Sequence, residues 1–214
     1  MVNKCLTCFL FLYGFLRIAH CFASFESHKY YHKTVSYYSE HTEEYILQTF
    51  STDMSEKYAL LEPFLHEGAS ILDVGFGAAR DMMHFKSLGY DVSGIDIEPN
   101  FVEHALSLGL DATLSDVREY QTQRKYDAIW ACASLLHLTQ EELFPVIDKL
   151  LSFLKIDGVL FLSMKKGEGM EVDEKGRRML YVSEKTFSSY NIILSQDTYE
   201  EARDLTWLNL IIKP

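Results

Sequence analysis

Short apolar runs alternate with amphipathic stretches through most of the chain. Residues 71–74 form an apolar run with β-branched members, which is typical of a strand buried in a parallel sheet. A helical stretch over residues 78–88 follows, and Gly89 ends it as a glycine after a helix commonly does. Residues 92–95 form a second apolar run that ends at Asp96. The pattern predicts a strand, a turn, a helix and a second strand in close succession.

The same alternation continues to the C-terminus. The hydrophobic pattern predicts further helices over residues 55–65, 100–108 and 139–154, the last opened by a capping box of Thr139 and Glu142. It predicts further strands over residues 112–114, 126–133, 159–164 and 205–212, with a shorter run at 192–194. Such alternation indicates an α/β fold: a Rossmann-like, doubly wound and mainly parallel sheet with right-handed crossovers.

Polar segments divide the chain. Residues 1–23 carry an apolar stretch that is too short and interrupted for an ordinary membrane span. This stretch reads either as a secretory signal or anchor, or as an extension from a mis-assigned start. Residues 24–65 form a tyrosine-rich helical leader, and residues 66–214 form the cofactor-binding domain. A charged loop is expected over residues 165–178, after the fifth strand.

The glycine turn after the first strand predicts a site for a nucleotide-type cofactor. Gly75 and Gly77 lack Cβ atoms, so their backbone can approach a ligand closely. Asp96 ends the second strand, where a carboxylate can accept hydrogen bonds from both hydroxyls of a ribose. Ligands of doubly wound sheets bind beyond the carboxyl ends of the strands, and both features fall there.

Two residues distinguish between cofactors. A dinucleotide fold favours a third small residue where this chain has Arg80. Asp73 lies inside the end of the first strand, where a carboxylate would repel a pyrophosphate and attract the ammonium group of an amino-acid cofactor. These residues favour S-adenosylmethionine over NAD, and they make Asp73 a candidate for binding the cofactor amine.

Several motifs carry a family resemblance. The run LDVGFGAARD, residues 72–81, resembles the LD-x-G-x-G-x-x-R-D motif of class I S-adenosylmethionine-dependent methyltransferases. Residues 126–138 and 153–169 resemble the family's fourth and fifth strands with their loops, and the closing WLNLIIKP resembles a bacterial subgroup akin to tellurite-resistance and small-molecule methyltransferases. Phe76 stands where members usually have cysteine, and its ring is expected to crowd the methionine end of the cofactor.

The resemblance implies S-adenosylmethionine as the methyl donor and an antiparallel strand near the C-terminus of the sheet. It includes Arg80 in the cofactor motif and sets Ile97 against the adenine face. It places Asp116 near the adenine amino group, with Val117 beside it, although an aspartate there can also cap a helix. Ala133, at the end of the fourth strand, falls next to the reactive methyl group.

The leader invites a functional interpretation. In similar proteins this region folds over the cofactor as a lid, which implies that Tyr37, Tyr45 and Thr49 face the cofactor. The alternative is a helix that packs on the edge of the sheet. Both interpretations are consistent with the helical pattern over residues 44–48.

His137 is the candidate catalytic residue. An imidazole titrates in the range that suits a general base, so His137 can take a proton from the methyl acceptor; a histidine that merely holds its loop is the alternative. Lys165, Arg177 and Arg178 either grip an anionic substrate or belong to a solvated charged loop. A metal site is not expected from the sequence.

Composition narrows the function. The chain has 214 residues and 48% hydrophobic content, which suits one domain with a sizeable core. Its formal net charge of −11 argues against nucleic acid as a partner. Because S-adenosylmethionine is made inside cells, a cytoplasmic location is expected, with secretion or anchoring through residues 1–23 as the alternative. Oligomeric state is not readable from the sequence.

The predicted function is methyl transfer from S-adenosylmethionine to a small-molecule acceptor by in-line displacement. A non-catalytic protein that binds S-adenosylmethionine is one alternative. A NAD-binding oxidoreductase on the same fold is another.

Overall fold

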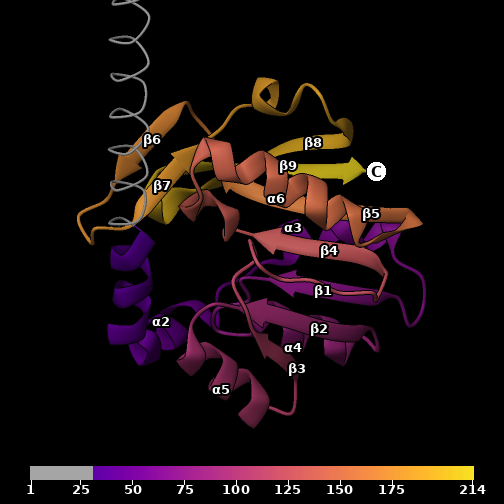
Figure 1. Cartoon of the computed structure of the whole chain (residues 1–214), viewed down its shortest axis with the longest axis horizontal. Helices are drawn as coiled ribbons and strands as arrows, with labels where there is room; N and C mark the ends of the chain where they lie inside the picture. Colours follow the sequence, from indigo (N-terminus) through magenta and orange to yellow (C-terminus); the bar gives the residue numbers. More distant parts are fainter. Residues whose placement is uncertain (1–30) are drawn as a thin grey trace, which may run out of the picture.

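The structure is a computed structural model that describes residues 31–214 (Figure 1). The predictions for residues 1–23, and for the first part of the leader, concern residues outside this range. Seven strands form one sheet in the order β3-β2-β1-β4-β5-β9-β8. These strands are β1 (Ser70–Val74), β2 (Asp91–Asp96), β3 (Asp111–Leu114), β4 (Tyr126–Cys132), β5 (Leu154–Lys165), β8 (Asn191–Glu200) and β9 (Leu205–Lys213).

The first five strands of the sheet run parallel to one another. β9 pairs antiparallel with β5, and β8 pairs antiparallel with β9. The sheet is therefore doubly wound and mainly parallel, with antiparallel strands at the C-terminus, as the sequence predicted. Parallel strands buried on both faces need apolar side chains on both sides, which explains the uninterrupted burial of β1.

The helices cover both faces of the sheet. They are α2 (Thr42–Thr49), α3 (Ser55–Leu61), α4 (Arg80–Ser87), α5 (Pro99–Ser107) and α6 (Gln140–Ser152), with short 3₁₀ turns η1 (Glu62–Phe64), η2 (Leu135–His137), η3 (Glu184–Phe187) and η4 (Glu201–Arg203). Side chains of α3, α4 and α5 share one apolar cluster with Ile71 and Trp130. Side chains of α6 share a second cluster with Leu72 and Ile129. Alternate residues of each central strand thus supply the two cores.

Local signals explain several boundaries. The capping box predicted at Thr139 is present, with Glu142 returning a hydrogen bond to the backbone of Thr139. Gly89 follows α4 with φ of +85°, a left-handed conformation that suits a glycine after a helix. Within residues 31–214, no helix combines the length and the apolar character that crossing a bilayer requires.

The expected charged loop is partly wrong. Residues 165–178 include β6 (Gly169–Val172), which pairs antiparallel with β7 (Arg178–Tyr181) as a separate two-stranded sheet. β7 is buried at Arg178, Met179 and Leu180, so this hairpin packs on the domain and does not extend into solvent as a loop. Flanking charges hid the short apolar run from the hydrophobic pattern.

The leader lies at the functional edge of the sheet. Residues 31–40 are helical, a single turn residue follows, and α2 continues to Thr49. Figure 1 shows α2 beside the edge where β1, β2 and β4 end. The leader therefore stands over the carboxyl ends of the strands, where a doubly wound sheet binds its ligands.

Candidate active site

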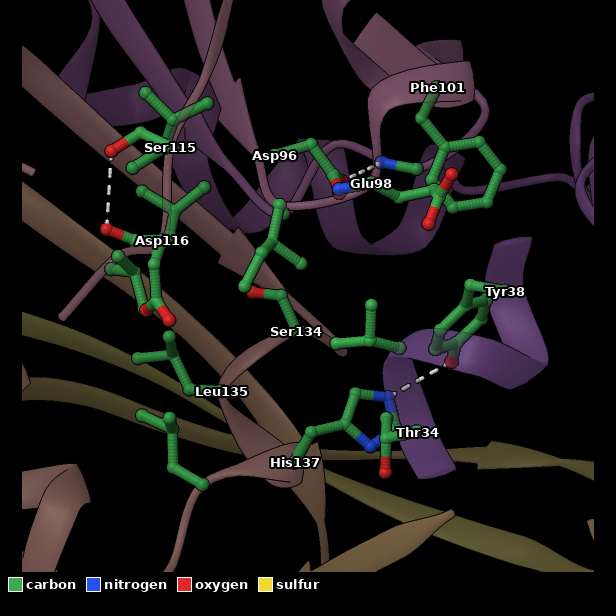
Figure 2. Close-up of a pocket in the computed structure, with 18 of the residues that line it drawn as sticks. Thr34, Tyr38, Asp96, Glu98, Phe101, Ser115, Asp116, Ser134, Leu135 and His137 are labelled. Carbon is green, nitrogen blue, oxygen red and sulfur yellow. Dashed lines mark hydrogen bonds between the residues drawn. The ribbon is translucent and has the colours of Figure 1, made fainter. Parts of the chain in front are cut away.

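A cavity lies between the leader and the carboxyl ends of the central strands. Figure 2 shows side chains from the leader, from the ends of β2 and β3, and from the loop after β4 around it. Most predicted site residues line this cavity: Tyr45, Gly75, Gly77, Asp96, Ile97, Asp116, Val117, Ala133 and His137. The predicted residues outside its lining are Tyr37, Thr49, Asp73 and Arg80.

The glycine turn is fixed by hydrogen bonds to β2. Gly75 and Gly77 have φ values of +70° and +52°, which residues with a Cβ rarely adopt. The N–H of Gly75 donates to the carbonyl of Ile95 at 2.8 Å, and the N–H of Gly77 donates to Oδ2 of Asp96 at 2.9 Å. An added Cβ on Gly77 would lie 3.1 Å from Cε1 of Tyr45, so the leader covers this turn closely.

The crowding expected from Phe76 does not occur. Its side chain is absent from the cavity lining and belongs to the core cluster under α4. Gly94 makes room for it, because a Cβ there would lie 2.7 Å from Cδ1 of Phe76 and 2.6 Å from Sδ of Met82. The bulky residue between the glycines is thus a core residue.

Asp96 is buried at the end of β2 and lines the cavity. Its Oδ2 accepts the N–H of Gly77, and its Oδ1 accepts the N–H of Glu98 at 2.9 Å. Burial raises the pKa of Asp96 to about 6, against the backbone hydrogen bonds that favour the charged form. A carboxylate oxygen can accept more than one hydrogen bond, so both oxygens can still receive a ligand hydroxyl.

Glu98 lines the cavity beside Asp96 and was not singled out by sequence reasoning. Only 2% of its surface is exposed. Its side chain caps α5 by accepting the N–H of Asn100 at 3.2 Å, and it accepts a hydrogen bond from the hydroxyl of Ser39 in the leader. An acid directly before Pro99 is a helix-start signal, which is how the sequence could have revealed it.

Asp73 lies behind the cavity wall with 2% exposure. Burial raises its pKa well above the usual value, and the charge of Asp81 adds to the effect while Arg80 opposes it. Its Oδ2 has no hydrogen-bond partner among the described residues. An acceptor of this kind fits a nearby cationic donor, and its contact with a cofactor amine stays a prediction.

Arg80 lies outside the cavity lining and holds neighbouring elements together through hydrogen bonds. It pairs with Asp81 through Nε–Oδ1 at 2.6 Å and Nη2–Oδ2 at 2.9 Å. Asp81 also accepts from the hydroxyl of Tyr58 at 2.5 Å and from Nε1 of Trp130 at 2.9 Å. Nη1 of Arg80 donates to the carbonyl of Thr49 at 3.3 Å, which ties the end of α2 to the start of α4.

Asp116 follows β3 and is held by its neighbours. Its carboxylate accepts the backbone N–H of Arg118 at 2.8 Å, the guanidinium of the same residue, and the hydroxyl of Tyr31 at 2.9 Å. Burial opposes ionisation, but these bonds keep the pKa of Asp116 below its usual value. Val117 lies beside it in the lining. An adenine amino group would therefore share this carboxylate with Tyr31.

His137 has both ring nitrogens engaged. Nδ1 lies 2.7 Å from the carbonyl oxygen of Arg178, which can only accept, so Nδ1 carries the proton. Nε2 lies 2.9 Å from the hydroxyl of Tyr38 and accepts its proton as a hydrogen bond (Figure 2). Burial lowers the pKa of His137 to about 4, with the carbonyl of Arg178 opposing this, so the ring is neutral at physiological pH.

The loop after β4 adds a strained residue and a polar atom. Ala133 has φ of +54°, which turns the chain sharply at the strand end. Ser134 follows it in the lining, and its buried Oγ has no hydrogen-bond partner among residues 31–214.

Two of the leader residues predicted to face the cofactor, Tyr37 and Thr49, do not line the cavity. Tyr37 accepts a hydrogen bond from Nζ of Lys175 at 2.8 Å, and the hydroxyl of Thr49 donates to the carbonyl of Tyr45. The leader residues that line the cavity besides Tyr45 are Tyr31, Thr34, Val35 and Tyr38. Their spacing of three, four and seven residues is that of one helical face, a signal that could have found them.

The cationic residues near the β6–β7 hairpin do not line the cavity. Arg178 is 2% exposed, and its Nη1 lies 3.5 Å from a carboxylate oxygen of Glu142, so the solvated loop predicted for it is wrong. Arg177 pairs with Asp173 at 2.7 Å, and Lys165 lies 3.4 Å from the hydroxyl of Tyr181.

Comparisons of sequence agree with this geometry. Residues 71–158 match the family model described as a methyltransferase domain. A Streptomyces venezuelae protein, dTDP-3-amino-3,4,6-trideoxy-alpha-D-glucopyranose N,N-dimethyltransferase, is 27% identical over 115 residues. That alignment covers 52% of this chain and 48% of the relative, so the chain spans about half the length of the curated relative it matches.

Solved structures share the fold. The 1,6-didemethyltoxoflavin-N1-methyltransferase of Burkholderia thailandensis, solved with 1,6-didemethyltoxoflavin and S-adenosylhomocysteine bound, is 19% identical with a TM-score of 0.68, covering 90% of this chain and 88% of that one. A TehB-like methyltransferase of Corynebacterium glutamicum is 17% identical with a TM-score of 0.64, covering 81% and 98%. Magnesium protoporphyrin IX methyltransferase of Synechocystis, solved with bound SAM, is 15% identical with a TM-score of 0.64, covering 84% and 95%.

The chain has the fold of the class I methyltransferases, and residues 71–158 match the methyltransferase-domain family model. The predicted resemblance to S-adenosylmethionine-dependent members of this class is thereby confirmed.

Proposed function

We propose that this protein is an S-adenosylmethionine-dependent methyltransferase that transfers a methyl group to a small-molecule acceptor by in-line displacement. The main support for this proposal is that the glycine turn is hydrogen-bonded to β2. Because Gly75 and Gly77 donate their N–H groups within the protein, the turn permits close backbone approach but withholds those amides from a pyrophosphate. That combination supports a sulfonium nucleoside over NAD.

The charges around the cavity support the same choice. Among the described residues that line it, three bear carboxylates, Asp96, Glu98 and Asp116, and one bears a guanidinium, Arg118. S-adenosylmethionine brings a sulfonium and an ammonium group, which carboxylates attract, whereas the pyrophosphate of NAD would be repelled. The oxidoreductase alternative is disfavoured on this ground.

Each end of the cofactor has a matching group in the protein. Asp96 would hold the ribose hydroxyls through the lone pairs that its backbone contacts leave open. Ile97 would pack on the adenine, with Asp116 near the adenine amino group. At the methionine end, Oδ2 of Asp73 and Oγ of Ser134 are buried polar atoms without partners among the described residues, which suits a polar ligand.

When bound, S-adenosylmethionine supplies a methyl group already activated by its sulfonium. The task of the protein is therefore to align the acceptor with that methyl group and to exclude water. Tyr45 closes over Gly77, and the leader covers the strand ends, which serves both purposes. Positioning of this kind can supply effective molarities of roughly 10⁵–10⁸ M.

Two relatives support a small-molecule acceptor. The Streptomyces venezuelae protein is named for N,N-dimethylation of a nucleotide-linked amino sugar, and the Burkholderia thailandensis protein for N1-methylation of 1,6-didemethyltoxoflavin. Their acceptors are chemically unlike each other, so the names point to a size class and not to one compound.

Calorimetry with S-adenosylmethionine, S-adenosylhomocysteine and NAD tests the proposal. We expect binding of the first two and none of NAD. Asp96→Asn should weaken S-adenosylhomocysteine at least about tenfold, because charge-assisted hydrogen bonds contribute about 1.5–3 kcal/mol each. Asp111→Asn is the matched control, because Asp111 is an exposed acid at the start of β3, the end away from the cavity. It should leave the affinity for S-adenosylhomocysteine unchanged.

Binding of NAD alone would overturn the proposal. Labelled S-adenosylmethionine, incubated with a panel of small-molecule acceptors, then separates the enzyme from a non-catalytic binding protein. Tight binding without turnover on any acceptor would favour the non-catalytic alternative.

A further inference from the structure

The cavity has one charged half and one uncharged half. The charged lining residues follow β2 and β3: Asp96, Glu98, Asp116 and Arg118. The opposite half is formed by the first leader helix and the loop after β4, and its described lining residues bear no formal charge. Figure 2 shows Asp116 and His137 on opposite sides of the cavity, with Ser134 between them. If the cofactor occupies the charged half, the acceptor must occupy the other.

The uncharged half is mainly apolar. Val35 and Tyr38 of the leader, with Leu135 and Leu138 of the β4 loop, form its walls. A charged acceptor would lose its hydration there without a counter-charge in the described lining, which disfavours its binding. Arg177 and Lys165 lie outside the cavity lining, Arg177 is paired with Asp173, and its guanidinium reaches this half only through its hydrogen bond to the hydroxyl of Tyr38.

Polar side chains in this half include Thr34 and Ser134, and Tyr38 and His137 form a hydrogen-bonded pair with each other. The proton on Nδ1 of His137 donates to the carbonyl of Arg178, so its Nε2 accepts the hydroxyl proton of Tyr38. Nη1 of Arg177 donates to the same hydroxyl oxygen from behind at 3.1 Å. The oxygen of Tyr38 thus donates once and accepts once, and it keeps one lone pair for a donor inside the cavity.

We infer, on the basis of the proposed function, that the methyl acceptor is an uncharged and largely apolar small molecule whose nucleophilic N–H or O–H donates to the hydroxyl of Tyr38. In this arrangement Tyr38 contacts the acceptor, and His137 acts through Tyr38. His137 is therefore the terminal proton acceptor and does not touch the nucleophile.

The proton path balances. As the nucleophile bonds to the methyl carbon, the carbon–sulfur bond breaks and its electron pair stays on sulfur. The acceptor proton passes to the oxygen of Tyr38, and the original hydroxyl proton of Tyr38 passes to Nε2 of His137. The positive charge lost from sulfur reappears on the imidazolium of His137, so the total charge in the cavity is unchanged. Loss of the sulfonium charge offsets part of the repulsion that Arg177 and Lys165 exert on a protonated His137 ring.

Matched ligands test the inference without the natural acceptor. The protein is first saturated with S-adenosylhomocysteine, and dissociation constants are measured for 2-naphthol, 2-methoxynaphthalene and 2-naphthoate, and for indole, 1-methylindole and indole-3-carboxylate. We expect the O–H and N–H members to bind about three- to tenfold tighter than their methylated partners, as one hydrogen bond allows. The carboxylates should bind most weakly.

Tyr38→Phe should remove the preference for O–H and N–H donors. Tyr199→Phe, at an exposed tyrosine of β8, is the matched control and should retain it. A preference that survives Tyr38→Phe, tighter binding of the carboxylates, or no binding of any neutral member would overturn the inference. Failure of S-adenosylhomocysteine itself to bind would instead overturn the proposed function.

Nitrogen NMR of the His137 ring gives an independent readout. The expected state near neutral pH is a neutral ring protonated on Nδ1. A ring protonated on Nε2, or on both nitrogens, would leave no acceptor for the proton of Tyr38 and would refute the path. Tyr38→Phe should change the chemical shift of Nε2 in particular, because its hydrogen-bond donor is lost.

Discussion

The backbone of Gly75 lies against the side chain of Ser134: an added Cβ on the glycine would stand 2.5 Å from Cβ of the serine. No ordinary contact is that short, so the turn after β1 and the loop after β4 can meet only at a glycine. Gly75→Ala should therefore combine a left-handed backbone penalty with a steric clash, at a cost of about 1–3 kcal/mol or more. It should also displace the loop that carries Ser134.

Gly89→Ala is the matched control for this variant. Gly89 has φ of +85°, but a Cβ there would meet no atom of residues 31–214 within 4 Å, so it bears the backbone penalty alone. Urea denaturation should find Gly75→Ala the less stable of the two, and calorimetry should find weaker S-adenosylhomocysteine binding only for Gly75→Ala. Equal losses in both variants would show that the contact with Ser134 does not matter.

The pH dependence of cofactor binding should report Asp96. Burial raises the pKa of this carboxyl to about 6, and under the proposed function the ribose hydroxyls of the ligand would donate to its charged form. The affinity for S-adenosylhomocysteine should hold above that value and fall as the pH drops through it, approaching about tenfold per pH unit. Calorimetry between pH 5 and pH 8 measures the effect. In Asp96→Asn the affinity should no longer fall at low pH, whereas in Asp111→Asn it should fall as in the wild type. If the affinity of Asp96→Asn still falls at low pH, a group other than Asp96 causes the pH dependence.

Recognition of the adenine amino group of the ligand should depend on Asp116. S-inosylhomocysteine has a carbonyl oxygen in place of that amino group, so at this position it offers the carboxylate an acceptor and no donor. The protein should prefer the adenosyl compound by about three- to tenfold, as one hydrogen bond allows. Competition binding with both compounds measures the preference.

A second variant tests whether Asp116 causes the preference for the adenosyl compound. Tyr31→Phe frees one contact of Asp116, because the hydroxyl of Tyr31 now donates to it at 2.9 Å. The preference for the adenosyl compound should therefore grow in Tyr31→Phe. An unchanged preference would indicate that Asp116 serves only its partners within the protein.

The sequence predicted the sheet, and it predicted several residues that line the cavity at the strand ends, because their signals are local. An apolar run, a glycine pair and a strand-end acid lie within a few residues of one another between Ile71 and Asp96, and chain connectivity alone brings them together. The capping box at Thr139 is equally local, and it is present as predicted. In a doubly wound fold, the order of elements fixes which strand ends meet.

The acceptor half could not be predicted because its contacts are distant in the chain. Tyr38 and His137 are 99 residues apart, and nothing near either of them indicates the other. The side chain of Arg178 is buried although its neighbours are charged, because β7 packs over the β4 loop and its backbone carbonyl binds His137. The leader presented a tyrosine-rich surface whose inward face only packing could decide, so Tyr37 was chosen where Tyr38 faces the cavity.

The pair of Arg80 and Asp81 should behave as a buried structural unit. Asp81→Leu would leave the guanidinium of Arg80 without its partner and would remove the acceptor that Tyr58 and Trp130 share. We expect a loss of about 3–5 kcal/mol in the free energy of unfolding. The double variant Arg80→Met/Asp81→Leu should recover part of that loss, because no unpaired charge remains buried.

An exposed ion pair is the matched comparison for that experiment. Arg124 and Asp91 lie 2.6 Å apart, but the Asp91 side chain is 66% exposed. Asp91→Ala should therefore cost less than about 1 kcal/mol by urea denaturation. A small loss in Asp81→Leu, similar to that of Asp91→Ala, would contradict the structural role given to Arg80.

Asp73 should lower the stability of the ligand-free protein while aiding cofactor binding. Burial and the charge of Asp81 raise its pKa well above the value of about 3.9 in an unfolded chain, so the native state holds the proton more tightly. Stability contributed by a carboxyl of this kind is present at low pH and is lost as the pH rises above the unfolded value. Asp73→Asn removes the ionisation and keeps the shape.

Thermal unfolding of Asp73→Asn at pH 5 and pH 8 tests that trade-off. Without ligand, the melting temperature of the variant should rise relative to that of the wild type as the pH rises. For a domain of this size, each kcal/mol of difference in the free energy of unfolding corresponds to about 2–4 °C. With S-adenosylhomocysteine the order should reverse, because the ammonium group of the ligand would interact with the charged Asp73 and not with an amide. Asp111→Asn should show neither effect. If the variant instead loses stability relative to wild type at pH 8, Asp73 is already compensated within the protein, and its contact with the cofactor amine is no longer needed to explain its burial.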